Sequence, residues 1–366
     1  MIAIFLVTRL ALAVVISIVL ATMPVWSGCL TCADVPMDLL GGLTRWDADA
    51  YLDIARNGYV GTGRESMGAY SPLYPALVRV GATIFGGSDT AYALAGALIA
   101  NAALLVALAG LLAIARPRVG EAGALRAATY VLVFPTTIFL TAAYAESLFL
   151  ALAVWSAVEA DRTRWWRSGT LAALAALTRP FGALAVLPLL FARLRAGRPP
   201  TTPGWTAYPP KRSTVLATAL APLAFIGWAG YLWAISGDPL NVVHVYAAWG
   251  SQARSPIDAF GDLFDPRIYG FPWVVLGLLV LFVALIAVAW RRWGAGFGTY
   301  SAGVLLVVAS SGSLTSSMRY ELAIFPAFLA LAVLTARPAA RIAWTTVSIA
   351  LALLFAGMYA LYYWIG

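Results

Sequence analysis

Residues 2–23, IAIFLVTRLALAVVISIVLATM, decide the fold class of this chain. The run is long enough to cross a bilayer, because a membrane-spanning helix needs about 20 mostly apolar residues. No clear basic segment precedes it, and it is longer than the apolar core of an ordinary signal peptide, which has about 7 to 15 residues. We therefore expect a retained first transmembrane helix and not a cleaved leader.

Apolar runs of similar character recur along the whole sequence. Hydrophobic residues make up 62% of the chain and charged residues only 11%, and the mean hydropathy is +0.84. This composition excludes a soluble globular protein. We expect an all-α, polytopic helical bundle with about 10 to 12 membrane segments in a single domain over residues 1–366. The further runs lie at about 71–86, 91–115, 124–141, 145–160, 168–192, 213–235, 271–290, 297–312, 320–335 and 342–364.

The arginines fall in short clusters between the apolar runs, which is the pattern of cytoplasmic loops. The net charge of +8 therefore indicates membrane orientation and no nucleic-acid partner. On this basis residues 24–70 form a first extracytoplasmic loop, 193–212 a cytoplasmic linker and 236–270 a second large extracytoplasmic loop. The clusters assigned to the cytoplasm are 116–126, 162–167, 193–212, 291–292 and 337–341.

Two stretches do not fit a simple series of crossings. An odd number of crossings must separate the outer loop ending near Tyr70 from the inner cluster at Arg116, yet two apolar runs lie between them. We expect one of the two to be short or re-entrant. The run 168–192 begins and ends beside basic clusters, so we expect two half-helices hinged at Arg179-Pro180, where proline interrupts the helical hydrogen bonds.

Residues 44–59, TRWDADAYLDIARNGY, place three carboxylates and two arginines after the first span. In a helix Asp49 and Asp53 share a face, while Asp47 points elsewhere. Two interpretations of Asp47 stay open. It is either a catalytic acid or the partner of Thr44 in a capping box at the helix start.

Other side chains of this segment have simpler interpretations. We expect Asp53 and Arg56 to form a surface ion pair. Trp46, Tyr51 and Tyr59 suit an interfacial helix anchored in the lipid headgroup layer. For Tyr51 and Tyr59 this anchoring role is the favoured interpretation.

Ionisable side chains inside or beside apolar runs are costly unless they are paired or solvated, so each is a functional candidate. They are Glu146, Arg179, Arg319 and Glu321. The alternative is a structural ion pair, for example Glu146 with Arg179.

The second outer loop holds His244, the only histidine, followed by Trp249, Gln252 and Arg254. An aromatic ring next to an amide and a guanidinium suits a sugar and a phosphate, although a loop lying on the membrane uses the same residue types. A lone histidine is more often a hydrogen-bonding loop residue than a catalyst.

Signatures of nucleotide and metal sites are missing from the sequence. It has no P-loop, no Gly-x-Gly-x-x-Gly between a strand and a helix, and no His-Glu-x-x-His. We expect no cofactor and no metal, and a lipid-borne donor used on the outer face. If their loop is extracytoplasmic, Cys29 and Cys32 can form a local disulfide; free thiols are the second alternative, and a metal site is the third, for want of further ligands.

Four segments resemble the PIG-V type of mannosyltransferase, a branch of the GT-C superfamily. They are Arg45-Trp46-Asp47-Ala48 with 54–59, Tyr70-Ser71-Pro72-Leu73-Tyr74-Pro75, Phe134-Pro135 through 143–149, and Met318-Arg319-Tyr320 through Phe325-Pro326. The chain departs from the family at Tyr246, where relatives often carry glutamine, and at 178–182, where an Arg-Ser-Asn-Gly-like string is usual. The Ala- and Arg-rich, Lys-poor composition is typical of a bacterial member.

The resemblance implies a GT-C bundle that transfers mannose, with inversion, from polyprenyl phosphate mannose to a hydroxyl on the extracytoplasmic face of a bacterial plasma membrane. The acceptor is a glycolipid, a polysaccharide lipid or a protein. Asp47 occupies the family's Arg-Trp-Asp position and is the expected base, with Asp49 as the second candidate. The expected phosphate-binding arginines are Arg179, Arg254 and Arg319, and the expected substrate-binding residues are Arg45, Trp46, Tyr74, Glu146, His244 and Trp249.

A transporter or flippase of a lipid-linked sugar is the rival function. It would place its charged residues near the middle of the membrane, in paired broken helices. Here the densest acidic cluster follows the first span in a loop, and this favours the enzyme.

Overall fold

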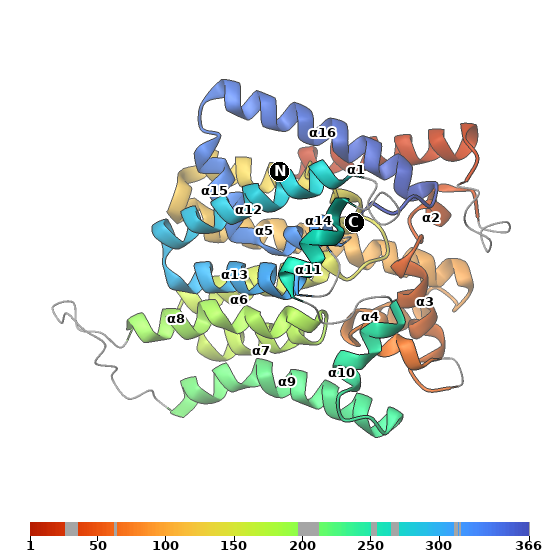
Figure 1. The fold of residues 1–366 in the computed structure, drawn as a ribbon, viewed down its shortest axis with the longest axis horizontal. Helices are drawn as coiled ribbons and strands as arrows, with labels where there is room; N and C mark the ends of the chain where they lie inside the picture. Colours follow the sequence, from red (N-terminus) through yellow and green to blue (C-terminus); the bar gives the residue numbers. More distant parts are fainter. Residues whose placement is uncertain are drawn as a thin grey trace.

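The computed structural model describes residues 1–25, 36–61, 64–196, 212–249, 255–264, 271–310, 314 and 316–365. All regular structure in these residues is helical, and they contain no β-strand. The expected all-α architecture is confirmed (Figure 1). Large apolar side chains on the outer helices are exposed, for example Leu10 at 66% and Val280 at 62%, as they are where helices face lipid.

Five helices in the described part of the chain are long and apolar enough to cross a membrane. They are α1 (Ile2–Thr22), α5 (Asp89–Leu132), α9 (Arg212–Ser236), α12 (Pro272–Trp293) and α16 (Pro338–Ala360). A sixth span forms if α14 (Ser317–Tyr320) and η6 (Glu321–Ala323) are joined to α15 (Phe325–Leu334), across a bend of 86°.

Several of the remaining apolar runs form shorter helices. They are α4 (Leu73–Ile84), α6 (Glu146–Asp161), α7 (Trp165–Ala176), α8 (Leu187–Ala196) and α13 (Ala295–Ala309). At about 1.5 Å per residue, helices of this length fall short of the roughly 30 Å hydrocarbon core. Complete crossings in the described residues are therefore fewer than the membrane segments expected from hydropathy.

The chain turns back on itself within α5. Gly120 has φ 71° and ψ 174°, a conformation that favours glycine, and it separates two helical arms. Asn101 in the first arm donates to the carbonyl of Thr141 at 3.0 Å. These two residues lie at similar distances along the chain before and after Gly120, so the chain after Gly120 returns alongside the first arm. The runs 91–115 and 124–141 are thus joined through a turn in an arginine cluster.

Both irregular stretches have the expected form. The helix α4 has 12 residues, so one of the two runs between Tyr70 and Arg116 is short. The helix α7 ends at Ala176, Arg179 is extended, and the 3-10 helix η3 (Pro180–Val186) begins at the proline. The hinge at Arg179-Pro180 is therefore present, because the residue before a proline avoids the helical conformation.

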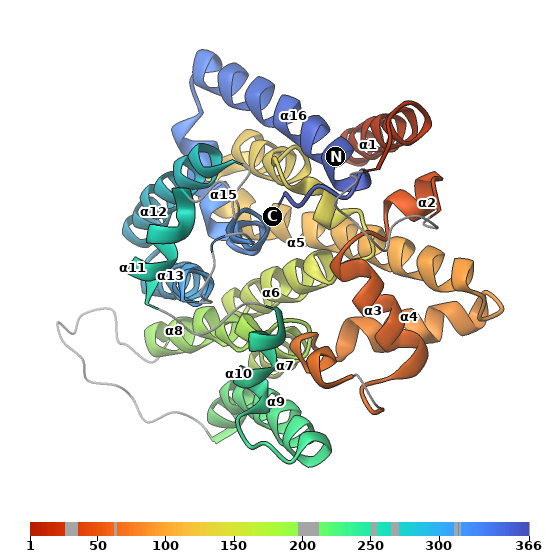
Figure 2. The same cartoon turned by 45° about the vertical axis from the view of Figure 1, so that its right-hand side comes forward.

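The two predicted outer loops meet at one end of the bundle. The first contributes α2 (Leu39–Gly42), α3 (Asp47–Asn57) and the 3-10 helix η1 (Glu65–Ala69), and the second contributes α10 (Asn241–His244), η4 (Val245–Trp249), α11 (Pro256–Gly261) and η5 (Asp262–Phe264). Figure 2 shows α3, α4 and α10 on the side away from the α15–α16 turn. The hydroxyl of Tyr246 donates to the carbonyl of Ala69 at 2.9 Å and ties the two loops together.

Within the expected cytoplasmic linker 193–212, α8 continues to Ala196 and α9 begins at Arg212, and the assignment of the linker stays a prediction. Residues 197–211 lie outside the described part of the chain, as do Cys29 and Cys32. The question of a disulfide between these cysteines therefore stays open.

A charged residue inside the first span has a structural role. Arg9 of α1 donates to the Thr141 hydroxyl, to Thr137 Oγ1 at 3.1 Å and to the carbonyl of Leu132 at 3.0 Å. These acceptors belong to the end of α5, to the 3-10 helix η2 (Thr137–Leu140) that follows it, and to Thr141 at the end of η2. Arg9 thus satisfies polar groups that would otherwise be buried without partners.

Candidate active site

The start of α3 positions Asp47. Trp46 precedes the helix with φ 59° and ψ −129°, a conformation that is strained for a residue with a side chain. Thr44 donates to the carbonyl of Gly41 at 3.0 Å and does not cap α3. The capping-box interpretation is therefore wrong, because the helix begins at Asp47 itself and leaves its carboxylate free to turn toward the bundle.

Four charged side chains from separate segments, Asp47 among them, meet in one cluster. Arg319 Nη1 lies 2.6 Å from Asp47 Oδ2, and Arg319 Nε lies 3.3 Å from Glu146 Oε1. Glu146 also forms an ion pair with Arg179, as the structural alternative predicted. Tyr70 donates its hydroxyl to Asp47 Oδ1 at 3.1 Å. Two acids and two arginines balance their charges inside the protein, as buried ions require.

Burial differs within this acid–arginine cluster. The side chains of Arg319, Glu146 and Arg179 are only 3%, 5% and 7% exposed, whereas that of Asp47 is 21% exposed. Asp47 is therefore the member of the cluster that a substrate can reach most easily.

Aromatic rings enclose the Arg319 guanidinium. Its central carbon lies 5.4 Å from the ring centre of Phe139, 5.6 Å from that of Tyr144, 4.8 Å from that of Tyr320 and 5.4 Å from that of Trp364. Arg319 Nη2 also donates to the Tyr320 hydroxyl at 2.8 Å. These contacts hold the guanidinium in one orientation and exclude water from it.

Asp49 lies outside the acid–arginine cluster. The Asp49 side chain is exposed at the surface, but the surrounding protein keeps part of the water away from its carboxylate. This partial removal from water raises the pKa of Asp49 from 3.8 to about 6, against the opposing charges of Arg45 and Arg56. Asp49 thus remains a second candidate base, because a carboxylate with a raised pKa accepts a proton more readily.

The expected ion pair between Asp53 and Arg56 does not form. Asp53 pairs with Arg64 at 2.7 Å, and Arg56 pairs with Asp89 at 3.0 Å. Local helical spacing suggested the first pairing, but folding brings Arg64 and the start of α5 closer.

The expected membrane-anchoring role of Tyr51 is also wrong, whereas that of the partly exposed Tyr59 stays a prediction. Tyr51 is 1% exposed and packs edge-on against Tyr70 and Tyr74. The Tyr59 ring packs against Trp228 of α9, with 5.0 Å between ring centres. Both side chains therefore join the first loop to the bundle.

Two expected substrate-binding residues make mainly internal contacts. Arg45 is 1% exposed and donates to the carbonyls of Ala360 and Pro36. Tyr74 is fully buried and donates to the carbonyl of Gly96 at 2.9 Å. These contacts favour structural roles for Arg45 and Tyr74.

Trp46 differs from these two residues. Its ring packs against Tyr362 and Trp364, while its buried Nε1 has no hydrogen-bond partner among the described residues. The binding role of Trp46 stays a prediction.

The second outer loop supplies one residue that the sequence analysis did not select as a site residue. His244 is exposed and lies 2.8 Å from Asp238, in an ordinary loop contact. Tyr246, in contrast, is partly buried and donates its hydroxyl to the carbonyl of Ala69 in the first loop. Its place opposite the family's glutamine was the available signal. Arg254 and the side chain of Trp249 lie outside what the structure describes.

Two further observations limit what the site contains. Glu321 is 1% exposed, and its carboxylate has no hydrogen-bond partner within the described ranges. It is therefore separate from the acid–arginine cluster. In the same residues no group of three His, Cys, Asp or Glu side chains could hold a metal ion.

The fold and the site define a helical membrane protein with a buried acid–arginine cluster at the end where its two large loops meet. The family model described as mannosyltransferase (PIG-V) matches residues 3–196, more than half of the sequence. The chain belongs to this family. The match includes Asp47, Glu146 and Arg179 and ends before Arg319.

Curated relatives are similar over part of the chain. GPI alpha-1,6-mannosyltransferase 2 of Mus musculus is 34% identical over 164 residues, which is 43% of this chain and 33% of the relative. The human protein of the same name is 31% identical over 161 residues, or 40% of this chain and 31% of the relative. The chain thus aligns with about a third of the length of these relatives. Among solved structures, the oligosaccharyltransferase of Archaeoglobus fulgidus aligns with 96% of this chain and 53% of its own, at 12% identity and a TM-score of 0.47.

Proposed function

We propose that this protein is a membrane mannosyltransferase of the GT-C type that uses polyprenyl phosphate mannose. The observation that carries the proposal is the contact of the partly exposed Asp47 with the buried Arg319, 2.6 Å apart. A base beside a guanidinium is what transfer from a sugar phosphate needs, since a proton is removed on one side and a phosphate leaves on the other.

In this mechanism Asp47 is the general base. Its carboxylate takes the proton of the acceptor hydroxyl while the hydroxyl oxygen forms a bond to C1 of mannose. The bond between C1 and the phosphate oxygen breaks, and its electron pair leaves with the phosphate. Attack from the face opposite the phosphate inverts the configuration at C1.

Arg319 links the two halves of the reaction. When Asp47 takes up the proton, its carboxylate becomes neutral and attracts the Arg319 guanidinium less strongly. Arg319 can then stabilise the negative charge that develops on the leaving phosphate. Glu146 and the surrounding aromatic rings keep Arg319 in place. Arg179 forms an ion pair with Glu146 and thereby fixes the position of that carboxylate. The assignment of Arg254 to the donor phosphate stays a prediction from the sequence.

The acceptor is a hydroxyl of a glycolipid, a polysaccharide lipid or a protein on the extracytoplasmic face, in a bacterial plasma membrane. The arginine clusters support this orientation. Loops rich in arginine tend to stay in the cytoplasm, and the two large loops are expected on the opposite face.

The test is to incubate the purified full chain with radiolabelled polyprenyl phosphate mannose and a lipid extract of its host. We expect label in a new product that survives mild acid, because a glycosidic bond to an acceptor replaces the acid-labile sugar phosphate. A protein that moves the donor across vesicle membranes and forms no labelled product is instead a flippase.

A further inference from the structure

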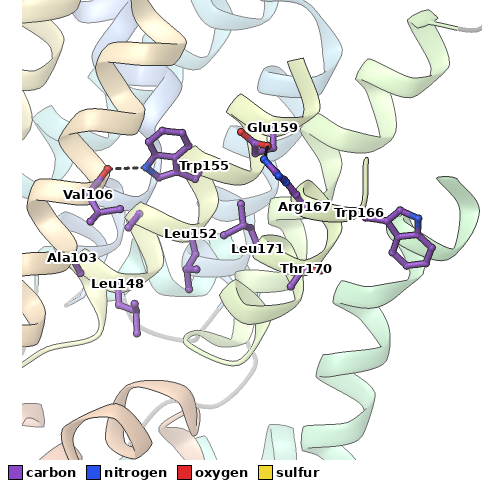
Figure 3. Close-up of a pocket in the computed structure, with 11 residues that line it drawn as sticks. Ala103, Val106, Leu148, Leu152, Trp155, Glu159, Trp166, Arg167, Thr170 and Leu171 are labelled. Atoms are coloured by element: carbon purple, nitrogen blue, oxygen red, sulfur yellow. Dashed lines mark hydrogen bonds and ion pairs between the residues drawn. The ribbon is translucent and has the colours of Figure 1, made fainter. Parts of the chain in front are cut away.

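A groove on the outside of the bundle extends along α6 from Leu148 to Glu159, so that one end lies away from the acid–arginine cluster. It has a volume of about 710 Å³ and runs between the first arm of α5, α6 and the start of α7 (Figure 3). This volume is within the range of roughly 300 to 1,000 Å³ typical of small-molecule sites. Residues along its walls include Val106, Leu148, Leu152 and Thr170, and one end is lined by Glu159 and Arg167.

The walls of this groove, which we call the α5–α6 groove, are mainly apolar. The indole N–H of Trp155 donates to the carbonyl of Val106 at 2.8 Å, as Figure 3 shows. Val106 is 52% exposed, so the groove opens sideways from the bundle. An apolar chain suits such a surface, because the chain covers the apolar walls and needs no hydrogen-bond partners from them.

The charged end carries more positive than negative charge. The Glu159 carboxylate is 7% exposed and lies 3.0 Å from Arg162, 3.4 Å from Arg164 and 3.9 Å from Arg167. One carboxylate thus faces three guanidinium groups, whose side chains are 45%, 50% and 70% exposed. The longest of the three contacts belongs to Arg167, the most exposed of these arginines. Its charge is therefore the least compensated and can bind an anion at the end of the groove.

Trp166 adds a further sign of a lipid interface. It lies beside Arg167 at the start of α7 and is 49% exposed. Tryptophan and arginine are typical of the level where lipid headgroups begin. The other end of α6 begins at Glu146 of the acid–arginine cluster, so the charged end of the groove lies a helix length away from the chemistry.

We propose that the α5–α6 groove binds one anionic phospholipid, with an acyl chain along Leu148 and Leu152 and the phosphate at Arg167. The charge at the end of the groove argues for a phospholipid of the leaflet on the arginine side. The donor's phosphate would instead lie beside Asp47 at the opposite end of α6. This inference does not depend on the proposed transferase activity.

Native mass spectrometry of the full chain in neutral detergent tests the site. The probes are phosphatidylglycerol and phosphatidylcholine with the same acyl chains. We expect one phosphatidylglycerol to bind more tightly than phosphatidylcholine and to raise the thermal midpoint. Arg167→Ala should raise the half-saturating concentration of phosphatidylglycerol about tenfold, the effect of losing one hydrogen bond to a charged group. Arg341→Ala, on the exposed start of α16, is the matched control and should change nothing.

A second variant tests the apolar part of the groove. Thr170 lines it from an exposed position, so Thr170→Trp fills the groove without disturbing the core and should weaken both lipids. Thr346→Trp, at an exposed position of α16, should have no effect.

Three results would overturn the proposal. The first is that phosphatidylglycerol and phosphatidylcholine bind equally tightly, both to the wild type and to Arg167→Ala. The second is unchanged binding in Thr170→Trp. The third is displacement of phosphatidylglycerol by an equal or lower concentration of polyprenyl phosphate, which would assign the groove to the donor's isoprenoid chain.

Discussion

Replacing Asp47 by asparagine separates proton transfer from structure. The asparagine oxygen can still accept a hydrogen bond from Tyr70 or Arg319, but the amide cannot take a proton. The shape of the side chain is kept, and α3 does not depend on Asp47 as a cap. We therefore expect Asp47→Asn to fold and to lose most of its transferase activity.

The expected loss can be estimated from the contacts. Removal of a general base lowers a rate by about 10²- to 10⁴-fold, which corresponds to about 3 to 5 kcal/mol in the activation barrier. Stability should change less. Arg319 loses one ionic partner at 2.6 Å but keeps Glu146 and the Tyr320 hydroxyl. Because Asp47 is 21% exposed, water can compensate part of that loss, and we expect a cost of about 1 to 3 kcal/mol.

The assay is transfer of radiolabelled mannose at saturating donor, with the thermal midpoint and donor binding measured on the same preparations. Asp49→Asn and Asp53→Asn are matched controls on the same helix and should lose less activity. Transfer near the wild-type rate in Asp47→Asn would refute the assignment of the base. If Asp49→Asn then lost its activity, the base would lie two residues further along; if both retained it, Glu146 would be tested next.

Three further predictions concern other parts of the molecule. Arg319→Ala should impair donor use at low donor concentration by about 2 to 5 kcal/mol, because a desolvated phosphate contact is lost; wild-type kinetics would remove Arg319 from the donor site. The raised pKa of Asp49, about 6, means that the folded protein holds a proton that the unfolded chain releases. The contribution of Asp49 to stability should therefore be most favourable below about pH 4 and should decline as the pH rises through 6, and a plot of thermal midpoint against pH should lose this component in Asp49→Asn. A reporter fused after Gly61 should be extracytoplasmic and one after Arg198 cytoplasmic; the same side for both would contradict the orientation.

The sequence by itself determined the class of the protein and the elements of its site. Hydropathy predicted the helical membrane bundle, because burial in lipid requires long apolar segments and leaves only helices or closed barrels. Proline placed the hinge after Arg179, since the ring removes a hydrogen bond wherever it occurs. Glu146, Arg179 and Arg319 were selected because ions in apolar runs need partners. These properties are local and can be read without knowing the fold.

The tertiary structure decided which of these residues meet. Asp47 and Arg319 are 272 positions apart, and no local pattern indicates that their side chains touch. The same limit explains two wrong predictions. Thr44 does not cap α3, because the conformation of Trp46 makes the helix begin at Asp47. Asp53 pairs with Arg64 and not with Arg56. An ion pair forms with whichever opposite charge the packed helices bring within reach, and that distance depends on the whole bundle and not on spacing along one helix.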